Sequence, residues 1–177
     1  LYLRAGEVVE SWNKSYAEGG FTQVFSEMNE SLKSWITKQF QDDTYKILDL
    51  FGGNGNLSSG LNYTERLVVD TYRENKDSSF FSQDLFDEKA VNRVMEKLSF
   101  DPTLLIFDPP RAGVKNLEEW TRAFPTEKIL YVSCDPHTLA RDLKTLGSAY
   151  RLDQLILFDF FPGTFHFETV AILSRAY

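Results

Sequence analysis

The chain has one cysteine, and the residues around it are typical of a strand that ends where a helix begins. Ile129 to Val132 are apolar and predict a buried strand, and a helix is predicted from His137 to Leu146. Asp135 and Pro136 are residue types that favour the N-cap and the first helical position. Cys134 therefore lies at the junction, where the positive end of the helix dipole would favour the thiolate. A free cysteine alone is more often a buried core residue, so its role depends on the other motifs.

A glycine-rich loop follows another predicted strand and has the form of half a nucleotide-binding crevice. The strand is Lys46 to Leu50, and the loop from Phe51 to Asn56 contains three glycines that let the backbone approach a ligand closely. Its spacing lacks the full dinucleotide fingerprint, which disfavours an NAD site. Asp70 ends the next predicted strand and is placed to bind two ribose hydroxyls, although a surface-loop aspartate explains it equally well in isolation. Asp84 follows the third predicted strand and could meet an adenine amino group.

Two further carboxylates could do acid–base chemistry beside the cysteine. Asp108 follows the apolar strand predicted from Thr103 to Phe107, and Pro109 and Pro110 then stop that strand and stiffen the loop. Glu168 comes near the start of the last predicted strand, in the run His-Phe-Glu-Thr-Val. A glutamate that faces water at a strand end is the alternative explanation for Glu168.

The order of the predicted elements is that of an open α/β sheet. Strands are predicted at 46–50, 66–70, 79–82, 103–107, 129–132, 152–158 and 167–173. Helices are predicted at 27–40, 87–98, 117–124 and 137–146. The last two strands are joined by Phe-Pro-Gly-Thr and should pair as a hairpin. We therefore predict a mostly parallel seven-stranded sheet with a C-terminal antiparallel hairpin strand.

The length of the chain fits one domain, which we place at 21–177. The chain has 177 residues, and no apolar run approaches the ~18 residues of a membrane span, so no membrane partner is expected. One cysteine and no zinc-ligand cluster predict a cytoplasmic protein without a disulfide or a metal. The net charge of −7 gives no overall basic footprint for nucleic acid. Residues 1–20 start at Leu1 rather than Met, and we expect a leading segment with one short strand after a missing N-terminal region.

Three motifs resemble those of the RNA 5-methyluridine methyltransferases, which are S-adenosylmethionine-dependent enzymes acting on tRNA or ribosomal RNA. They are Ser-Cys-Asp-Pro-His-Thr-Leu-Ala-Arg-Asp-Leu at 133–143, Asp-Pro-Pro-Arg-Ala-Gly at 108–113 and His-Phe-Glu-Thr-Val at 166–170. Phe-Thr-Gln at 21–23 and Leu-Asp-Leu-Phe-Gly-Gly-Asn-Gly-Asn at 48–56 are similar to the family's cofactor-binding motifs. The resemblance implies the Rossmann-like fold of class I methyltransferases.

The resemblance also implies S-adenosyl-L-methionine as the cofactor and a role for each matching residue. Cys134 would be the nucleophile and Glu168 the base, with Asp108 lining the pocket between cofactor and base. The candidate cofactor contacts are Gln23, Phe51, Gly53, Asn56, Asp70, Asp84 and Asp108. The candidate substrate contacts are Arg111, for a phosphate or a carbonyl, and His166. Phe25 stands where the family usually has Asn, and Gly53 where it often has Cys.

The chemistry of uracil explains why the implied reaction needs one thiol and one carboxylate. Carbon 5 is a poor nucleophile, and a thiolate that adds at carbon 6 turns it into a carbanion that can take a methyl group. A base must then remove the proton from carbon 5 before the thiolate leaves. The uridine must also leave its stack to reach the site.

Members of this family commonly carry an N-terminal RNA-binding domain, which would supply the phosphate contacts that this acidic chain lacks. Some also hold an iron–sulfur cluster, which needs several thiolates and is not expected here.

Two other classes of function compete with this one: a methyltransferase with a different target atom and a non-enzymatic domain. A methyltransferase acting on an exocyclic amine also uses Asp-Pro-Pro, but an aromatic residue usually follows, and that reaction needs no cysteine. RNA cytosine-5 methyltransferases place Pro-Cys in the motif where this chain has Pro109 and Pro110. A cofactor-binding domain that has lost catalysis and serves RNA binding is the non-enzymatic alternative, with Phe25 as its support.

Overall fold

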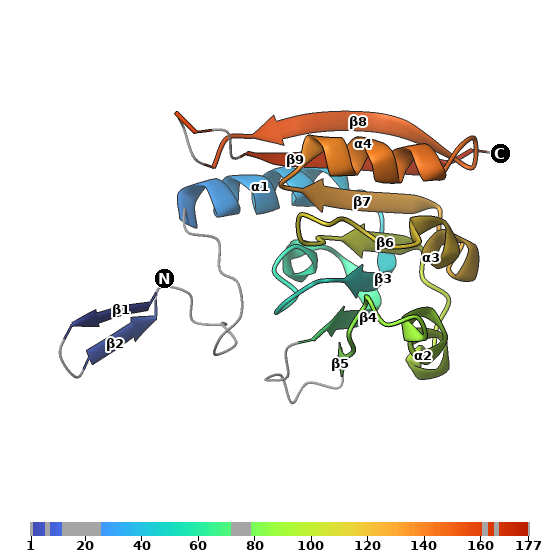
Figure 1. Cartoon of the computed structure of the whole chain (residues 1–177), viewed down its shortest axis with the longest axis horizontal. Helices are drawn as coiled ribbons and strands as arrows, with labels where there is room; N and C mark the ends of the chain where they lie inside the picture. The colour runs from blue at the N-terminus through green and yellow to red at the C-terminus, as the bar shows by residue number, and fades with distance from the viewer. Residues whose placement is uncertain are drawn as a thin grey trace.

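The computed structural model describes residues 2–5, 8–11, 26–71, 79–160, 163–164 and 167–176 (Figure 1). Seven of the strands in these ranges form one sheet in the order β5-β4-β3-β6-β7-β9-β8. The strands are β3 (Tyr45–Leu50), β4 (Tyr63–Asp70), β5 (Phe80–Ser82), β6 (Leu104–Phe107), β7 (Lys128–Ser133), β8 (Tyr150–Phe158) and β9 (Glu168–Arg175). The helices are α1 (Ser26–Gln39), α2 (Ala90–Lys97), α3 (Leu117–Ala123) and α4 (Pro136–Thr145), with a short 3₁₀ turn, η1 (Ser58–Gly60). None of the helices in these ranges is both long and apolar enough to cross a membrane.

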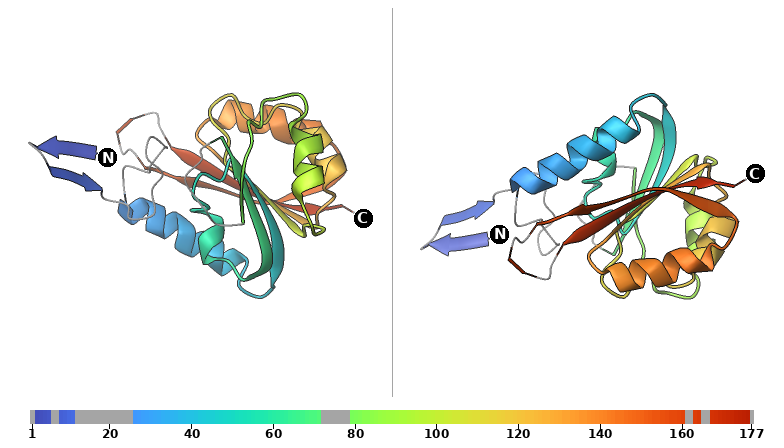
Figure 2. Two further views of the ribbon diagram at one scale, coloured as in Figure 1. Left: turned by 90° about the horizontal axis from the view of Figure 1, so that it is seen from below. Right: turned by 90° about the horizontal axis from the view of Figure 1, so that it is seen from above.

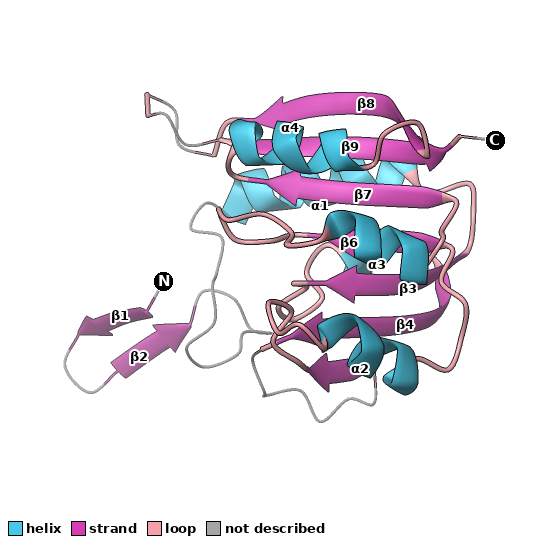
Figure 3. Ribbon diagram, turned by 45° about the vertical axis from the view of Figure 1, so that its right-hand side comes forward, coloured by secondary structure: helices cyan, strands magenta, loops and turns pink. Residues whose placement is uncertain are grey.

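The sheet is parallel from β5 to β7 and antiparallel at its other edge, which confirms the predicted fold class (Figure 3). β9 lies between β7 and β8 and runs antiparallel to both. The second strand of the hairpin, rather than the first, therefore joins the body of the sheet. Burial explains this order, because Val170 to Leu173 are buried and apolar, whereas β8 carries the exposed polar residues Arg151, Asp153 and Gln154.

Helices cover both faces of the sheet, and strand residues alternate between two cores. α1 packs on one face, and α2, α3 and α4 pack on the other (Figure 2). In β3, Leu48 and Leu50 belong to the core beneath α2, α3 and α4, whereas Ile47 belongs to the core beneath α1. Central parallel strands that are covered on both faces appear in the sequence as short apolar runs, which is why they were predictable.

Three expectations about the elements are wrong. β4 begins at Tyr63 rather than at residue 66. The second helix begins at Ala90 rather than at residue 87, because Asp87 forms a turn. Its carboxylate accepts a hydrogen bond from the Lys89 N–H at 2.8 Å, and its carbonyl accepts one from the Ala90 N–H at 3.0 Å. The leading segment holds two strands rather than one, β1 (Tyr2–Ala5) and β2 (Val8–Ser11), which pair antiparallel in a separate sheet.

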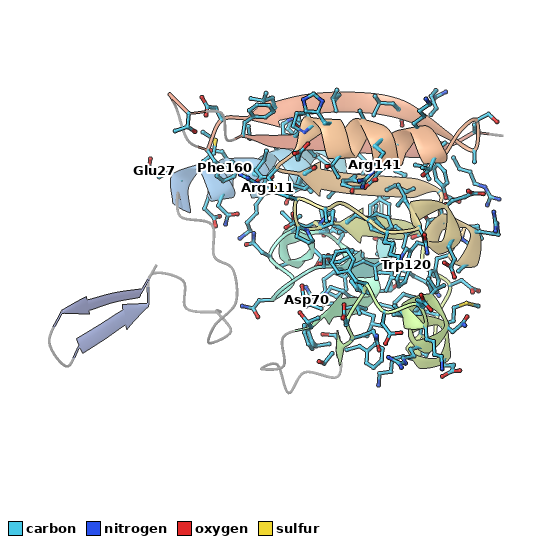
Figure 4. The ribbon with its side chains drawn as sticks, viewed as in Figure 1. Glu27, Asp70, Arg111, Trp120, Arg141 and Phe160 are labelled. Atoms are coloured by element: carbon cyan, nitrogen blue, oxygen red, sulfur yellow. The ribbon has the colours of Figure 1, made fainter. Side chains whose placement is uncertain are left out.

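Trp120 of α3, labelled in Figure 4, is 1% exposed and stacks on Phe124 with ring centroids 6.0 Å apart. Trp120→Ala should lower the free energy of unfolding by about 3–5 kcal/mol, because it removes a large buried ring and leaves a cavity. Leu155 of β8 is 58% exposed, and Leu155→Ala is the control, with an expected change below about 0.5 kcal/mol. Urea unfolding followed by circular dichroism measures both, and equal losses would contradict the packing described here.

Candidate active site

The predicted site residues come together at one edge of the sheet, because the central strands are parallel and end there. β3 leads into Phe51, β4 ends in Asp70, β6 leads into Asp108 and β7 leads into Cys134. β9 runs the opposite way, so its first residue, Glu168, lies at the same edge. Open α/β sheets bind their ligands at the carboxyl ends of the strands.

The pairing of β7 with β9 brings Cys134 and Glu168 together. The register pairs Ser133 with Thr169, so Cys134 and Glu168 each come one residue beyond this last pair, at the same end of the ladder. Both residues are partly buried. The Glu168 carboxylate is near enough to raise the pKa of the Cys134 thiol. The structure therefore places the predicted nucleophile beside the predicted base.

Glu168 has the protonation behaviour of a group that exchanges protons near neutral pH. Burial raises the pKa of Glu168 from 4.5 to about 7. A general acid or base is most effective when its pKa lies near the working pH, since both of its forms are then present.

Cys134 differs from its prediction, because its pKa is raised rather than lowered. Burial is the largest cause and the Glu168 carboxylate the second, while a hydrogen bond from Arg111 and its positive charge act in the opposite direction. The Asp135 carboxylate caps α4, as predicted, and accepts hydrogen bonds from two N–H groups of the first turn at 2.9 and 3.0 Å. This negative charge offsets the dipole of α4 near the sulfur. The charge that favours the thiolate here therefore belongs to Arg111.

Asp108 lies in a cluster of acidic residues. Burial raises its pKa well above the ordinary value, and the carboxylates of Glu168, Asp49 and Asp70 raise it further. A carboxyl group held in its neutral form can donate a hydrogen bond as well as accept one. The Asp108 N–H donates to the Leu50 carbonyl at 3.2 Å, which joins the ends of β6 and β3.

The glycine-rich loop after β3 has a backbone that few residue types adopt. Gly53 and Gly55 have φ of +54° and +73°. Phe51 has φ of +60°, an unusual conformation for a bulky residue and one found at ligand sites. A side chain at Gly52 would place its Cβ 2.6 Å from the carboxyl carbon of Asp49. The loop therefore packs directly on β3 and leaves its backbone close to the sheet edge.

Asp70 is tied to this loop. Its Oδ2 accepts a hydrogen bond from the Gly53 N–H at 2.9 Å, and its Oδ1 accepts from the N–H and the hydroxyl of Thr71 at 2.6 and 3.1 Å. Phe51 belongs to the same loop, and its ring lies near that of Phe86, with ring centroids 5.5 Å apart. This part of the edge combines a carboxylate with aromatic surface, as a nucleoside requires.

The other predicted cofactor contacts have protein partners as well. Asn56 pairs with the buried Asn29 of α1, since each side-chain amide donates to the other, at 2.9 and 3.4 Å. Asp84 is exposed and accepts a hydrogen bond from the Phe86 N–H at 2.9 Å. Gln23, Phe25 and His166 lie outside the described residues, and their assignments stay predictions.

Asp49 of β3 is a candidate that the sequence reasoning missed. It is 0% exposed and accepts a hydrogen bond from the Ser58 hydroxyl at 2.6 Å, while its Oδ1 has no hydrogen-bond partner among the described residues. Burial raises its pKa to about 6. The signal was a carboxylate within the apolar strand Lys-Ile-Leu-Asp-Leu, because a buried carboxylate with an oxygen left without a hydrogen bond points to a functional site.

The fold is that of a Rossmann-like α/β domain, in which a thiol, a carboxylate and a glycine-rich loop lie at one edge of the sheet. The family model of the tRNA (uracil-5-)-methyltransferases matches residues 76–176, more than half of the sequence. The chain belongs to this family.

Relatives and solved structures agree with that family. The chain is 32% identical over 184 residues to a tRNA/tmRNA (uracil-C(5))-methyltransferase from Pseudomonas fluorescens, covering 89% of this chain and 50% of the relative. It is 29% identical over 182 residues to the enzyme of the same name from Enterobacter sp. (strain 638), and the match covers 89% of this chain and 49% of that relative. It is also similar to the crystal structure of Pyrococcus abyssi tRNA (uracil-54, C5)-methyltransferase in complex with S-adenosyl-L-homocysteine. That similarity has a TM-score of 0.60 and 26% identity over 97% of this chain and 49% of the other. The chain spans about half the length of the curated relatives it matches.

The raised pKa of Glu168 should make stability depend on pH. Below its ordinary pKa of 4.5 the carboxyl is protonated in both the folded and the unfolded chain. Between 4.5 and about 7 only the unfolded chain ionises, so the free energy of unfolding falls as pH rises and the loss is complete above about pH 7. Glu168→Gln removes this contribution, and the fall between about pH 5 and about pH 8 should be smaller by roughly 2 kcal/mol.

Urea unfolding at the two pH values measures this difference. Glu88→Gln, at an exposed glutamate, is the matched control and should keep the wild-type fall. The same fall in wild type and Glu168→Gln would show that Glu168 ionises normally in the folded protein.

Proposed function

We propose that this chain is a catalytic domain that transfers the methyl group of S-adenosyl-L-methionine to carbon 5 of a uridine in tRNA. The observation that carries the proposal is the placement of Cys134 beside Glu168 at the paired ends of β7 and β9. A thiol and a carboxylate are the two groups that methylation at carbon 5 requires. The family of the chain and the names of its relatives support uridine in tRNA as the substrate class.

The residues around the ends of β3 and β4 fit the cofactor. Asp70 offers a carboxylate for the ribose hydroxyls, and Phe51 and Phe86 offer aromatic surface for the adenine. Gly52, where a side chain would overlap β3, lets the loop backbone lie close to a bound nucleoside. When bound, S-adenosyl-L-methionine supplies an electrophilic methyl group on a sulfonium.

Cys134 and Glu168 act in turn on the uracil ring. The Cys134 thiolate forms a bond to carbon 6, and the electron pair of the 5,6 double bond moves onto carbon 5 and its neighbouring carbonyl. Carbon 5 then forms its bond to the methyl group as the methyl–sulfonium bond breaks, which would leave the electron pair of that bond on the sulfur of the cofactor. Glu168 then accepts the proton from carbon 5, the double bond forms again, and the carbon–sulfur bond breaks with its electron pair returning to sulfur.

Three other features of the site assist these steps. Arg111 stabilises the negative sulfur both before addition and as it leaves, because its side chain hydrogen-bonds with Cys134. Glu168, with its pKa of about 7, is partly ionised at neutral pH and can accept a proton there. Asp108 lines the pocket between the cofactor and the base.

The proposal assigns most of the phosphate contacts to sequence outside this chain. The net charge of −7 repels the RNA backbone, and the relatives are about twice as long as the part that this chain matches. We place the reaction in the cytoplasm, as expected from the cysteine content.

Asp70→Ala should weaken binding of S-adenosyl-L-methionine by about tenfold or more, because charge-assisted hydrogen bonds to the ribose are lost. Titration calorimetry on this chain measures the affinity. Asp101→Ala, at an exposed aspartate before β6 and so at the opposite edge of the sheet, is the control and should bind normally. Unchanged affinity in Asp70→Ala would move the ribose site elsewhere.

Cys134→Ala and Glu168→Gln should both abolish efficient methylation of unmodified tRNA but stop it at different steps. Cys134→Ala has no nucleophile, so no covalent species can form. Glu168→Gln keeps the thiol but lacks the base, so elimination stalls and turnover falls by about 10²–10⁴-fold. Denaturing electrophoresis with methyl-labelled cofactor should then show a slow band of protein joined to methylated RNA.

The two variants separate the proposal from its competitors. Methylation that persists in Cys134→Ala would favour transfer to an exocyclic amine, since the chain has no second cysteine. Normal turnover in Glu168→Gln would remove Glu168 from the base role. Cofactor binding with no methylation by wild-type protein on any RNA would favour a domain without catalysis.

A further inference from the structure

The loop that carries Arg111 is fastened to α4 by three hydrogen bonds. The Thr138 hydroxyl donates to the Arg111 carbonyl at 3.0 Å. The Arg141 Nη2 donates to the Ala112 carbonyl at 2.8 Å. The Asp142 Oδ2 accepts from the Val114 N–H at 2.8 Å. Residues 138, 141 and 142 lie on one face of a helix, so a single turn of α4 holds the whole loop.

Asp142 is the centre of this attachment. It is 2% exposed, and besides the loop it accepts hydrogen bonds from the Tyr131 hydroxyl at 2.6 Å and from Arg141 at 2.8 and 2.6 Å. Tyr131 belongs to β7, so one buried carboxylate joins the sheet, the helix and the loop. A buried carboxylate with this many donors is held in one geometry. It also fixes the positions of the groups that donate to it, which are those of the loop, β7 and α4.

Gly113 allows the loop to approach α4 this closely. Its φ is +77°, and a Cβ there would lie 2.3 Å from both the Asp142 Oδ2 and the Thr138 Cγ2. Its N–H donates to the Pro110 carbonyl at 2.8 Å, which closes a turn around Arg111 and Ala112. The attachment therefore depends on Gly113 in the loop as well as on Thr138 and Asp142 in α4.

The same helix also fixes Cys134. α4 begins at Pro136, two residues after the cysteine, and its N-cap Asp135 is held by the Ser133 hydroxyl, which accepts from the Asp135 N–H at 3.2 Å. The cysteine and the loop bearing Arg111 are thus both anchored to α4. Figure 4 labels Arg141 beside α4 and Arg111 to its left.

We propose that Arg141 and Asp142 are positioning residues, which hold the Arg111 loop so that its guanidinium stays against the Cys134 sulfur. Neither residue has to touch the substrate or the sulfur for this role. The inference deepens the proposed function, because it concerns the residue that stabilises the proposed nucleophile. Among the described residues, the charged groups acting on the sulfur are Arg111 from the loop and Glu168 from β9. Displacing Arg111 leaves only the carboxylate, which disfavours the thiolate.

Alkylation of Cys134 by iodoacetamide tests this role directly, because the chain has no other cysteine. The midpoint of the rate against pH reports thiol ionisation, whereas the plateau at high pH reports access to the sulfur. Arg111→Ala should move the midpoint up and slow alkylation near pH 7 by about tenfold, as one pKa unit implies. Arg141→Ala should slow it by about threefold with an unchanged plateau, and Thr138→Val should act in the same direction.

A double variant separates positioning from general destabilisation. Arg141→Ala should have no further effect on the midpoint in an Arg111→Ala background, since it acts through Arg111. Arg122→Ala, which breaks an exposed ion pair of α3 with Glu118, is the matched control and should keep the wild-type midpoint. The Arg141 side chain is 58% exposed, so this variant should fold, and circular dichroism verifies it.

Two results would overturn the inference. One is a wild-type midpoint in folded Arg141→Ala, and the other is an equal shift with and without Arg111. The assay needs neither RNA nor cofactor, so it stands even if the chain methylates nothing. Failure of the proposed function would appear instead as persistent methylation in Cys134→Ala, which leaves the alkylation result untouched.

Discussion

The antiparallel pairing of β9 with β7 is the interaction on which the site depends. Successive side chains of a strand face opposite sides, so a slip of one residue would turn Glu168 to the other face and separate it from Cys134. β9 packs on both cores, with Val170 beneath α1 and Ala171 on the opposite face, so a slip would exchange side chains of different size between two close-packed cores. The core thereby fixes the geometry of the thiol and the carboxylate. A hairpin strand placed at the edge of the sheet would not fix the position of Glu168 in this way.

The same edge gathers carboxyl groups whose burial opposes folding at neutral pH. Asp49, Asp108 and Glu168 all have raised pKa values, with burial as the first cause, and their neighbouring carboxylates add to the effect for Asp49 and Asp108. Such groups are retained where their protonation or hydrogen bonding is used, which is why strongly shifted carboxyls cluster at functional sites. The helix-covered cores on both faces of the sheet offset the loss in free energy of unfolding that these buried carboxyl groups cause.

The sequence predicted the elements that are determined locally. β3, β6 and β7 are short apolar runs, and the Asp135 cap of α4 follows from residue types at adjacent positions. The position of β9 inside the sheet was not predictable, because a hairpin signal does not say which of its strands pairs with β7. The raised pKa of Cys134 was also missed, because burial, its largest cause, and the Glu168 carboxylate, its second, both depend on how distant segments of the chain pack together.

In the proposed reaction the Cys134 sulfur must both attack and leave, and its raised pKa favours the attack. A thiol with a strongly lowered pKa departs easily but is a weak nucleophile, since nucleophilicity falls with pKa. Burial and Glu168 keep this sulfur basic, while Arg111 lowers the cost of its negative charge when the charge forms. Asp142 joins the loop of Arg111 to the helix that follows Cys134. The loop therefore holds the exposed arginine close to the sulfur, where its positive charge stabilises the thiolate. The electrostatic balance at the sulfur is therefore set by the packing of the loop on α4 as much as by the residues that touch it.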